Sequence, residues 1–343
     1  MSEPSTQQVR IGFIGCGGIS HWHVQRLANV PEAKIVALCD PAPASIERIV
    51  TRFPELAELP RFADHREMLR SEVGIDGVQL HSPHTTHFQQ AMDSLDAGMH
   101  VLTEKPMVCT VDHAHLLLKK IAATGKKFAI SYQRHFERTF RFVKQKIDGG
   151  ELGDVQYVTA FLGQNWYTGT KGSWRQSLTL SGGGQLNDSG SHMLDILLWV
   201  TGLQAEEVSA YSKNFDSEVD INTAAAVRFT NGAQGTISII GNFPVWWEDI
   251  TFAGSKATIL LRQGRLFWAA FGDQNAREVS PDEMPAGSDP DRNWVEAIVY
   301  DRPIETPPIC GLRVIELTEA AWRSAASGRP VRVDRREPAV APA

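Results

Sequence analysis

The most constraining feature of the chain is a glycine-rich turn between an expected strand and an expected helix. The segment VRIGFIG is short, apolar and β-branched, and it leads at once into CGGIS. Gly15, Gly17 and Gly18 permit a tight turn and a close backbone approach, because glycine tolerates positive φ and has no Cβ. Ser20 takes the place of the usual third glycine and is still small. The helix that follows would point its free N–H groups at a phosphate, so this order predicts a phosphate-binding turn in a dinucleotide-type fold.

Strands and helices alternate up to about residue 130, which predicts a doubly wound parallel sheet covered on both faces. The expected strands are 9–15, 34–40, 76–82, 100–106 and 127–133, and the expected helices are 19–30, 44–53, 87–98 and 110–125. In the first helix, the spacing places Ile19, Trp22, His23, Arg26 and Leu27 on one face.

The pattern changes after residue 130, where strand signals dominate. A helix at 139–150 precedes expected strands at 154–163, 223–240, 248–261 and 264–271, with further helices at 184–202 and 311–328. The dipeptide Asn231-Gly232 divides 223–240 into two strands, because Asn-Gly is a strong hairpin signal. We therefore expect residues 1–130 to form a nucleotide-binding domain. Residues 131–333 are expected to form an α/β domain with a large, mostly antiparallel open sheet, and a helix at about 312–327 can pack back on the first domain.

Composition and charge exclude several classes of protein. The 343 residues carry a net charge of −6 and contain no apolar run long enough to cross a membrane, which argues against nucleic-acid and membrane partners. The polar N-terminus lacks the apolar core of a secretory signal, so we expect a cytoplasmic protein. The four cysteines form neither a CxxC pair nor a disulfide pattern, and we interpret them as free buried thiols. Cys16 and Cys39 would end two early strands and can be neighbours.

An acidic residue ends the second expected strand. Asp40 lies 25 residues after Gly15, where a dinucleotide fold places the acid that accepts hydrogen bonds from the ribose hydroxyls. Its charge would repel a 2′-phosphate, and the following DPAPAS segment brings no immediate Arg or Lys. The sequence therefore predicts NAD as the cofactor and makes NADP the weaker alternative.

Two short segments carry the candidate chemistry. Glu104 and Lys105 end the strand HVLTEKP, and ligands bind outside the carboxyl ends of strands in such sheets. Asp188 and His192 are spaced i, i+4 and so would share one face of a helix, with Gly190 leaving room between them. The alternatives are a surface Glu–Lys pair and an Asp–His pair that only caps a helix.

Taken together, these motifs resemble the glucose–fructose oxidoreductase / inositol dehydrogenase (Gfo/Idh/MocA) family of NAD(P)-dependent sugar oxidoreductases. The resemblance runs from the glycine turn through HSPHTTH, GMHVLTEKP, GELGDVQYV and SGGGQLNDSGSHMLD to SAASGRPVRV near the C-terminus. It implies a Rossmann domain followed by an α/β domain whose open sheet forms the subunit interface of a homodimer or homotetramer.

The resemblance also implies roles for individual residues. The family's catalytic lysine corresponds to Lys105, and its Asp…His pair corresponds to Asp188 and His192. Oxidation of a secondary alcohol removes a hydroxyl proton as hydride leaves carbon; a neutral histidine suits proton acceptance near pH 7, and a lysine suits stabilisation of the oxygen. Asp188 can orient the imidazole or bind a neighbouring hydroxyl. Which of Lys105 and His192 takes the proton stays open.

The implied cofactor site combines the glycine turn with three later segments. Ser82 and His84 replace the Thr and Asn of the family's TPN segment, and Trp174-Arg175 resembles a pair that reaches the cofactor in some members. The expected cofactor-binding residues are Gly15, Gly17, Gly18, Ile19, Asp40, Ser82, His84, His87, Glu104, Lys105, Trp174 and Arg175. Although His81, His84 and His87 recur at spacing three, loop histidines need not converge, and we favour no metal site.

The leading interpretation is an NAD-dependent dehydrogenase acting on a sugar, a sugar derivative or a cyclic polyol such as an inositol. One alternative is an NAD-dependent glycosidase or lyase that oxidises its substrate transiently. Another is a non-catalytic NAD-binding regulator, which would not need Lys105, Asp188 and His192 together. Trp166, Tyr167, Trp246 and Trp247 are candidate sugar-stacking aromatics, or else core and interface residues.

Overall fold

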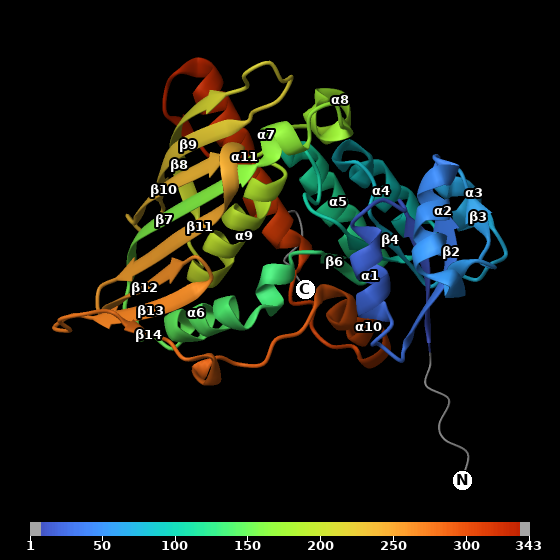
Figure 1. The fold of residues 1–343 in the computed structure, drawn as a ribbon, viewed down its shortest axis with the longest axis horizontal. Coiled ribbons are helices and arrows are strands. Elements are labelled where there is room, and N and C mark those ends of the chain that lie inside the picture. Colours follow the sequence, from blue (N-terminus) through green and yellow to red (C-terminus); the bar gives the residue numbers. More distant parts are fainter. Residues whose placement is uncertain (1–7, 337–343) are drawn as a thin grey trace, which may run out of the picture.

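The computed structural model describes residues 8–336 and contains two β-sheets side by side (Figure 1). The first sheet is parallel, with the strand order β3-β2-β1-β4-β5-β6. Its strands are β1 (Val9–Ile14), β2 (Ala33–Cys39), β3 (Arg61–Phe62), β4 (Gly77–Leu80), β5 (His100–Thr103) and β6 (Phe128–Ile130). The helices between them are α1 (Ser20–Leu27), α2 (Pro43–Arg52), α3 (His65–Arg70), α4 (His87–Asp96) and α5 (Val111–Thr124). This arrangement confirms the predicted parallel sheet, while β3 and α3 are too short to have given a clear sequence signal.

The second sheet is large and mostly antiparallel, as predicted. Its order is β14-β13-β12-β11-β7-β10-β9-β8-β15, and the one parallel pair among its described strands joins β7 to β10. The strands are β7 (Val155–Asn165), β8 (Ala205–Lys213), β9 (Asn222–Phe229), β10 (Gln234–Ile240), β11 (Asn242–Gly254), β12 (Ala257–Arg262), β13 (Arg265–Ala270), β14 (Arg277–Glu278) and β15 (Val331–Arg332). The predicted hairpin is present, because β9 and β10 pair antiparallel around Gly232, whose φ is +89°.

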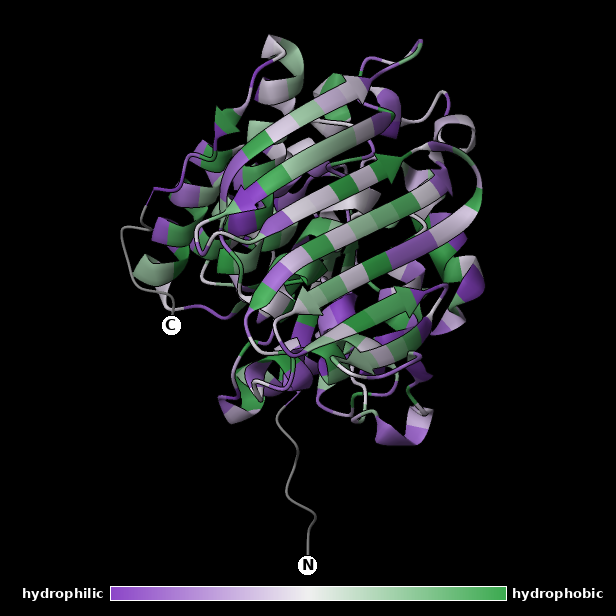
Figure 2. Cartoon of the chain, turned by 90° about the vertical axis from the view of Figure 1, so that its left-hand side faces the viewer, coloured by the Kyte–Doolittle hydropathy of each residue, from purple (hydrophilic) through white to green (hydrophobic). Residues whose placement is uncertain are grey.

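Helices cover one face of this sheet, and the other face is open (Figures 1 and 2). The helices of this part of the chain are α6 (Arg138–Asp148), α7 (Trp166–Gly169), α8 (Leu178–Ser181), α9 (Ser189–Thr201), α10 (Pro290–Tyr300) and α11 (Pro308–Ser327). Within the described residues, no helix is both long and apolar enough to span a bilayer.

The C-terminal part of the chain returns to the first sheet. Helix α10 packs against α1, β1, β5 and β6, and the indole of Trp294 is fully buried against Gly77. Sequence analysis assigned no helix there. The expected closing helix is α11, which contacts β8 and α9 on one side and α5 and β6 on the other. The division of the chain at residue 130 stays a prediction, and α10 shows that later residues complete the first half.

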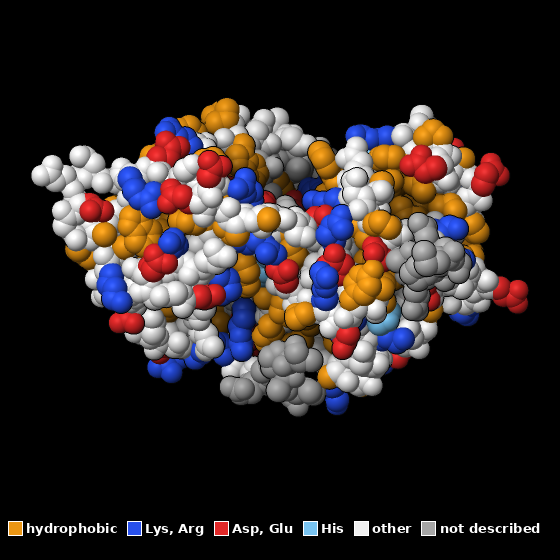
Figure 3. Space-filling model, turned by 90° about the horizontal axis from the view of Figure 1, so that it is seen from below, with side chains coloured by type: hydrophobic (Ala, Val, Ile, Leu, Met, Phe, Trp, Pro, Cys, Tyr) orange, Lys and Arg blue, Asp and Glu red, His pale blue; other side chains and the backbone are white. Residues whose placement is uncertain are grey.

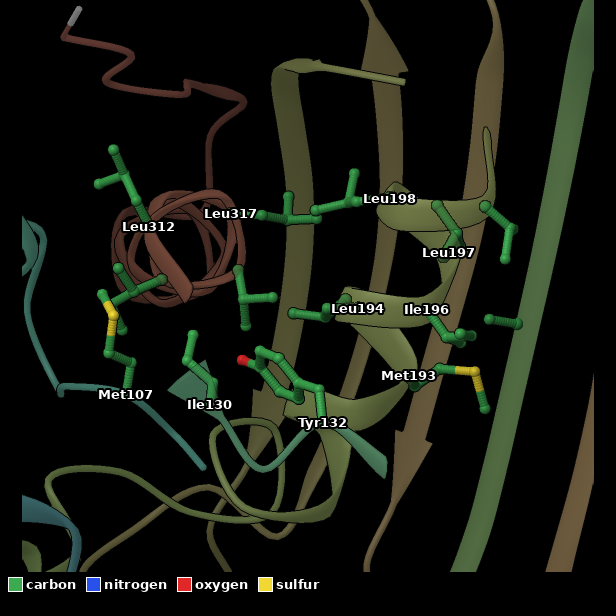
Figure 4. Close-up of a cluster of buried hydrophobic side chains, with 14 of the residues drawn as sticks. Met107, Ile130, Tyr132, Met193, Leu194, Ile196, Leu197, Leu198, Leu312 and Leu317 are labelled. Carbon is green, nitrogen blue, oxygen red and sulfur yellow. The ribbon is translucent and has the colours of Figure 1, made fainter. Parts of the chain in front are cut away.

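A buried apolar cluster joins the two halves beside the EKP segment (Figure 4). Leu194 and Leu198 of α9 face Leu317 of α11, and Ile130 and Met107 lie on the side of the first sheet. Helix α11 approaches so closely that a Cβ added at Gly311 would lie 2.7 Å from the Cβ of Met107. Because Met107 follows Lys105 by two residues, this packing fixes the EKP segment relative to α11, which also contacts α9.

Candidate active site

The glycine turn has the conformation that the sequence predicts. Gly15 adopts a φ of +95°, and a Cβ there would lie 2.7 Å from the backbone carbon of His81. A Cβ at Gly17 or Gly18 would meet nothing within 4 Å, so this side of the turn is open to a ligand. Helix α1 begins directly after the turn, and no side chain within residues 8–336 caps its N-terminus. The turn therefore offers free backbone donors to an anion.

Asp40 lies beside the glycine turn, directly after β2. Its Oδ2 accepts a hydrogen bond from the backbone N–H of Cys16, and its Oδ1 accepts one from the N–H of Ala42, both at 2.8 Å. The carboxylate is therefore fixed next to the turn and keeps lone pairs for further donors. The expected proximity of Cys16 and Cys39 is also found, because the Cys16 thiol lies 3.8 Å from the carbonyl oxygen of Cys39.

Lys105 and Asp188 meet across the two halves of the molecule. The Lys105 Nζ lies 2.6 Å from Asp188 Oδ1 and also donates to the Asp188 carbonyl oxygen at 3.2 Å. Asp188 is 4% exposed and accepts two further hydrogen bonds at Oδ2, from Trp166 Nε1 at 2.8 Å and from Arg175 Nε at 3.0 Å. Burial alone would raise the pKa of Asp188, but the charges of Lys105 and Arg175 hold it well below its usual range. Asp188 is therefore an ionised group that organises this part of the site.

The prediction that Asp188 lies within a helix is wrong. Helix α9 begins at Ser189, so Asp188 precedes it, and the helix expected from residue 184 is a loop up to that point. Asp220 explains the difference, because its side chain accepts hydrogen bonds from the N–H groups of Gly184 and Leu186. A Cβ at Gly184 would lie 1.8 Å from the Asp220 carbonyl oxygen. Gly184 thus allows the loop before α9 to approach the backbone of Asp220 closely, and this loop does not continue the helix.

His192 faces the same cavity as Lys105. The cavity has a volume of about 410 Å³ and is lined by Ile19, Trp22, Arg26, Glu104, Lys105, Gln133 and His192. Burial, followed by the nearby charges of Lys105 and Arg134, lowers the pKa of His192 well below 6.5, so its imidazole is neutral at pH 7. Within residues 8–336 no hydrogen bond joins Asp188 to His192, and Nδ1 of His192 is buried without a partner. Asp188 thus contacts Lys105, Trp166 and Arg175. It does not hold the imidazole of His192 in the way we expected.

A smaller cavity of about 100 Å³ adjoins this site. Its lining residues are Ile19, His81, Ser82, His84, Glu104, Lys105, Trp174 and Arg175. All except His81 belong to the set that the sequence predicts around the cofactor. Trp174 packs edge-on against His84, with ring centroids 4.7 Å apart, and the Arg175 guanidinium lies 4.5 Å from the centre of the Trp174 ring.

The three histidines of HSPHTTH have separate partners. His81 stacks on His23, His84 Nδ1 lies 3.2 Å from the carbonyl oxygen of Ser181, and His87 lies between the carbonyl oxygens of Pro106 and Ser82. Burial lowers the pKa of His84 to about 3, so its contact with Asp188 at 3.7 Å is not an ion pair. His87 lines neither cavity and links the HSPHTTH loop to the EKP segment, so its contact with a cofactor stays a prediction.

A buried chain of charges that sequence analysis missed lies behind Lys105. His23 Nε2 is 3.1 Å from Glu104 Oε1, and His23 Nδ1 is 2.7 Å from Asp291 Oδ1. Burial opposes protonation of His23, but the two carboxylates raise its pKa to about 9. The Glu104 carboxylate also accepts a hydrogen bond from the backbone N–H of Lys105. Glu104 therefore lines both cavities while His23 and this N–H fix its carboxylate. Asp291 lies far along the chain, in α10, so no local pattern could have revealed this contact.

Both halves of the chain match one family. Residues 9–132 match the oxidoreductase family with an NAD-binding Rossmann fold, and residues 140–260 match the GFO/IDH/MocA C-terminal domain. The chain belongs to the GFO/IDH/MocA oxidoreductase family. This confirms the resemblance found in the sequence.

Several GFO/IDH/MocA proteins are similar over most of their length. The scyllo-inositol 2-dehydrogenase (NAD(+)) of Bacillus subtilis is 25% identical over 280 residues, covering 80% of this chain and 77% of the relative. The WlbA dehydrogenase from Bordetella pertussis, solved with NADH and UDP-GlcNAcA, is 25% identical with a TM-score of 0.83, covering 96% and 100% of the two chains. A levoglucosan dehydrogenase solved with NADH and levoglucosan shares the fold, with a TM-score of 0.87 at 19% identity and the same coverage.

The geometry fits the NAD of the GFO/IDH/MocA family. The open side of Gly17 and Gly18 leaves room for a pyrophosphate, and the fixed Asp40 carboxylate lies at the strand end where a ribose would be recognised. The smaller cavity continues from Ile19 at the start of α1 to Ser82 and Lys105 at the ends of the next strands. NAD is therefore the cofactor that these residues accommodate.

Proposed function

We propose that this protein is an NAD-dependent dehydrogenase that oxidises a secondary hydroxyl of a sugar, a sugar derivative or a cyclic polyol. The observation that carries the proposal is the shared cavity of Lys105 and His192 beside the nucleotide turn, with Lys105 paired to a buried Asp188. The names of the family relatives, which act on an inositol or were solved with a sugar or sugar nucleotide, support this substrate class.

NAD(H) supplies the hydride chemistry of the reaction. Lys105 comes from the nucleotide half and would donate a hydrogen bond to the reacting oxygen, where it stabilises developing negative charge. Asp188 stays ionised and holds the Lys105 ammonium in place, so the positions of both charges are set before the substrate reacts. Trp166 and Arg175 hold the other oxygen of Asp188 and limit its movement.

His192 is the proposed proton acceptor. Because its pKa lies well below 6.5, the imidazole is already neutral when the alcohol arrives and can accept the hydroxyl proton. Lys105 remains charged as a hydrogen-bond donor in this assignment. The acid limb of kcat/KM for oxidation should accordingly lie below pH 6.5.

Incubation with NAD and a panel of compounds tests the proposed reaction. The panel contains scyllo- and myo-inositol, levoglucosan, glucose and p-nitrophenyl glycosides. Formation of NADH with at least one ring polyol or sugar supports a dehydrogenase. Release of p-nitrophenol without net NADH would instead support redox-assisted cleavage, and NAD binding without either product would support the regulator.

We further propose that the open face of the second sheet forms a homodimer or homotetramer interface. Phe161 of β7, Ala226 of β9 and Thr236 of β10 alternate with buried residues along the central strands, and none of the three is charged. Figure 2 shows this open face of the sheet. Elsewhere acidic and basic side chains are interspersed, as Figure 3 shows for one face. The molar mass measured by light scattering should be a multiple of the 37.9 kDa of one chain. The Thr236→Lys variant, which places a charge near the centre of the sheet, should have a lower molar mass.

We also propose a cytoplasmic location. Cys16, Cys39, Cys109 and Cys310 are all free thiols, and three of them are buried. Free cysteines without a disulfide partner are typical of reducing compartments. Fractionation of the source cells with an antibody against the chain tests this location.

A further inference from the structure

The residues that the sequence pattern placed on one face of α1 divide between two faces in the structure. Its inner face is buried and consists of Ser20, His23, Val24 and Leu27. Ile19, Trp22 and Arg26 form a second stripe at spacings of three and four, and all three line the cavity that contains Lys105 and His192. The nucleotide half therefore contributes a wall to the candidate substrate site in addition to its phosphate-binding turn.

Trp22 is the unusual member of this stripe. It is 59% exposed although it stands in the first turn of a well-packed helix, and no aromatic ring stacks on it within the described part of the chain. The neighbouring His21, by contrast, packs edge-on against Phe53. When a ligand covers a large apolar side chain that was in contact with water, apolar surface is buried, and this burial favours binding of the ligand.

The stripe is held in a fixed position. One turn after Trp22, Arg26 Nη1 lies 3.4 Å from Asp291 Oδ2 in α10. The other oxygen of Asp291 accepts from Gln79 Nε2 at 3.0 Å and contacts His23 Nδ1. Because α1 is anchored from behind by its buried face and from the side by α10, the backbone that carries Trp22 is preorganised for binding.

The cofactor is a weaker candidate for the ligand of Trp22. The smaller cavity that contains Ser82, Trp174 and Arg175 includes Ile19 but not Trp22. Trp22 instead shares the larger cavity with Gln133 and His192, which belong to segments after the nucleotide-binding strands. The indole therefore lies on the substrate side of Lys105.

We propose that Trp22 is the platform on which the apolar C–H face of a ring-shaped substrate stacks. The inference rests on the proposed function and adds to it a specificity residue and a ligand class. Indole binds flat apolar faces, while Lys105, His192 and Gln133 supply polar groups for hydroxyls in the same cavity. A pyranose or cyclitol presents such a face, whereas an open-chain polyol does so only after losing conformational freedom. The site should thus favour cyclic over acyclic polyols.

Steady-state kinetics of Trp22→Ala and Trp22→Phe test the platform. Loss of the indole should raise KM for the best cyclic substrate about 10-fold with kcat changed less than about twofold, because stacking holds the bound ring without taking part in bond changes. Trp22→Phe should recover most of the affinity, and the Kd for NAD should stay unchanged in both variants. Phe271→Ala, which truncates an aromatic side chain that is 77% exposed and outside the cavity, is the matched control.

Two results would overturn the platform. One is an unchanged KM in Trp22→Ala; the other is an increase in the Kd for NAD that accounts for the whole kinetic loss. A direct binding measurement separates this inference from the proposed function. Calorimetric titration of ring sugars into the NAD complex of wild type and Trp22→Ala reports on the platform even if no compound on the panel is oxidised. Equal affinities in that titration reject the platform, and weaker binding to the variant supports it.

Discussion

Asp188 shows how one residue can combine the chemistry of both halves of the molecule. It receives the Lys105 ammonium from the first sheet and the Trp166 indole and Arg175 guanidinium from the second half. Three donors offset the cost of burying its charge, which a lone carboxylate in that position could not sustain. The sequence indicated that Lys105 and Asp188 matter, but their contact depends on a sequence separation of 83 residues.

Replacing Lys105 by Ala should reduce kcat about 10²- to 10³-fold, because a charged donor to the reacting oxygen is lost. The Kd for NAD, measured by fluorescence titration, should change little. Lys127→Ala is the matched control, since Lys127 pairs with Asp301 at the surface. A Lys105→Ala enzyme that is folded in a thermal melt and keeps the wild-type kcat would remove Lys105 from the mechanism.

Replacing Asp40 by Ser should shift the cofactor preference. The change removes the negative charge opposed to a 2′-phosphate while leaving an oxygen near the Cys16 N–H. The ratio of kcat/KM for NAD to that for NADP should fall about 10-fold or more. Wild-type enzyme that already prefers NADP would show that Asp40 does not recognise the ribose.

At the level of elements, the least predictable segment is the loop before α9. The i, i+4 spacing of Asp188 and His192 suits a helix, but three backbone N–H groups from Gly184 to Leu186 bond to Asp220 instead. Because of those contacts α9 begins only at Ser189, and Asp188 lies just before its first residue. Helix periodicity alone could not reveal the competing partner, because Asp220 precedes a strand of the second sheet.

Replacing Gly184 by Ala should destabilise the protein by roughly 2–4 kcal/mol, because a backbone atom occupies the space that the Cβ needs. Gly169→Ala is the matched control, since a Cβ there meets nothing within 4 Å and its φ is not positive. Urea unfolding of both variants gives the two free energies. Equal stabilities would mean that the loop can move away from Asp220 at little cost.

At the scale of the whole molecule, the first half is completed by late residues. Helix α10 brings Asp291 behind Lys105, and α11 packs Leu312 and Leu317 between the two sheets (Figure 4). The site thus lies where three parts of the chain converge, and its stability is coupled to the docking of α10.

This coupling predicts a pH dependence of stability. The pKa of His23 is raised from 6.5 to about 9, so its charged form stabilises the fold fully below pH 6.5, and that contribution is lost as pH rises through about 9. The free energy of unfolding should fall by about 3 kcal/mol between pH 6.5 and 9.5. His23→Gln should flatten this slope, whereas His21→Gln, which changes a partly exposed neighbour with no carboxylate partner among the described residues, should keep it. Urea titrations at each pH provide the measurement, and a steep slope in His23→Gln would assign the effect to other groups.

The sequence by itself determined the parallel sheet and the glycine turn, and it pointed to Asp40 and Lys105 as candidate site residues. Each of these depends on neighbours within a few residues: alternating apolar runs, glycines that permit positive φ, and acids or bases at strand ends. The tertiary structure alone decided that Trp22 lines the cavity of Lys105 and His192, that His87 joins two loops, and that His23 links Glu104 to Asp291. These outcomes depend on which distant segment packs against each side chain, and a local pattern contains no information about that partner.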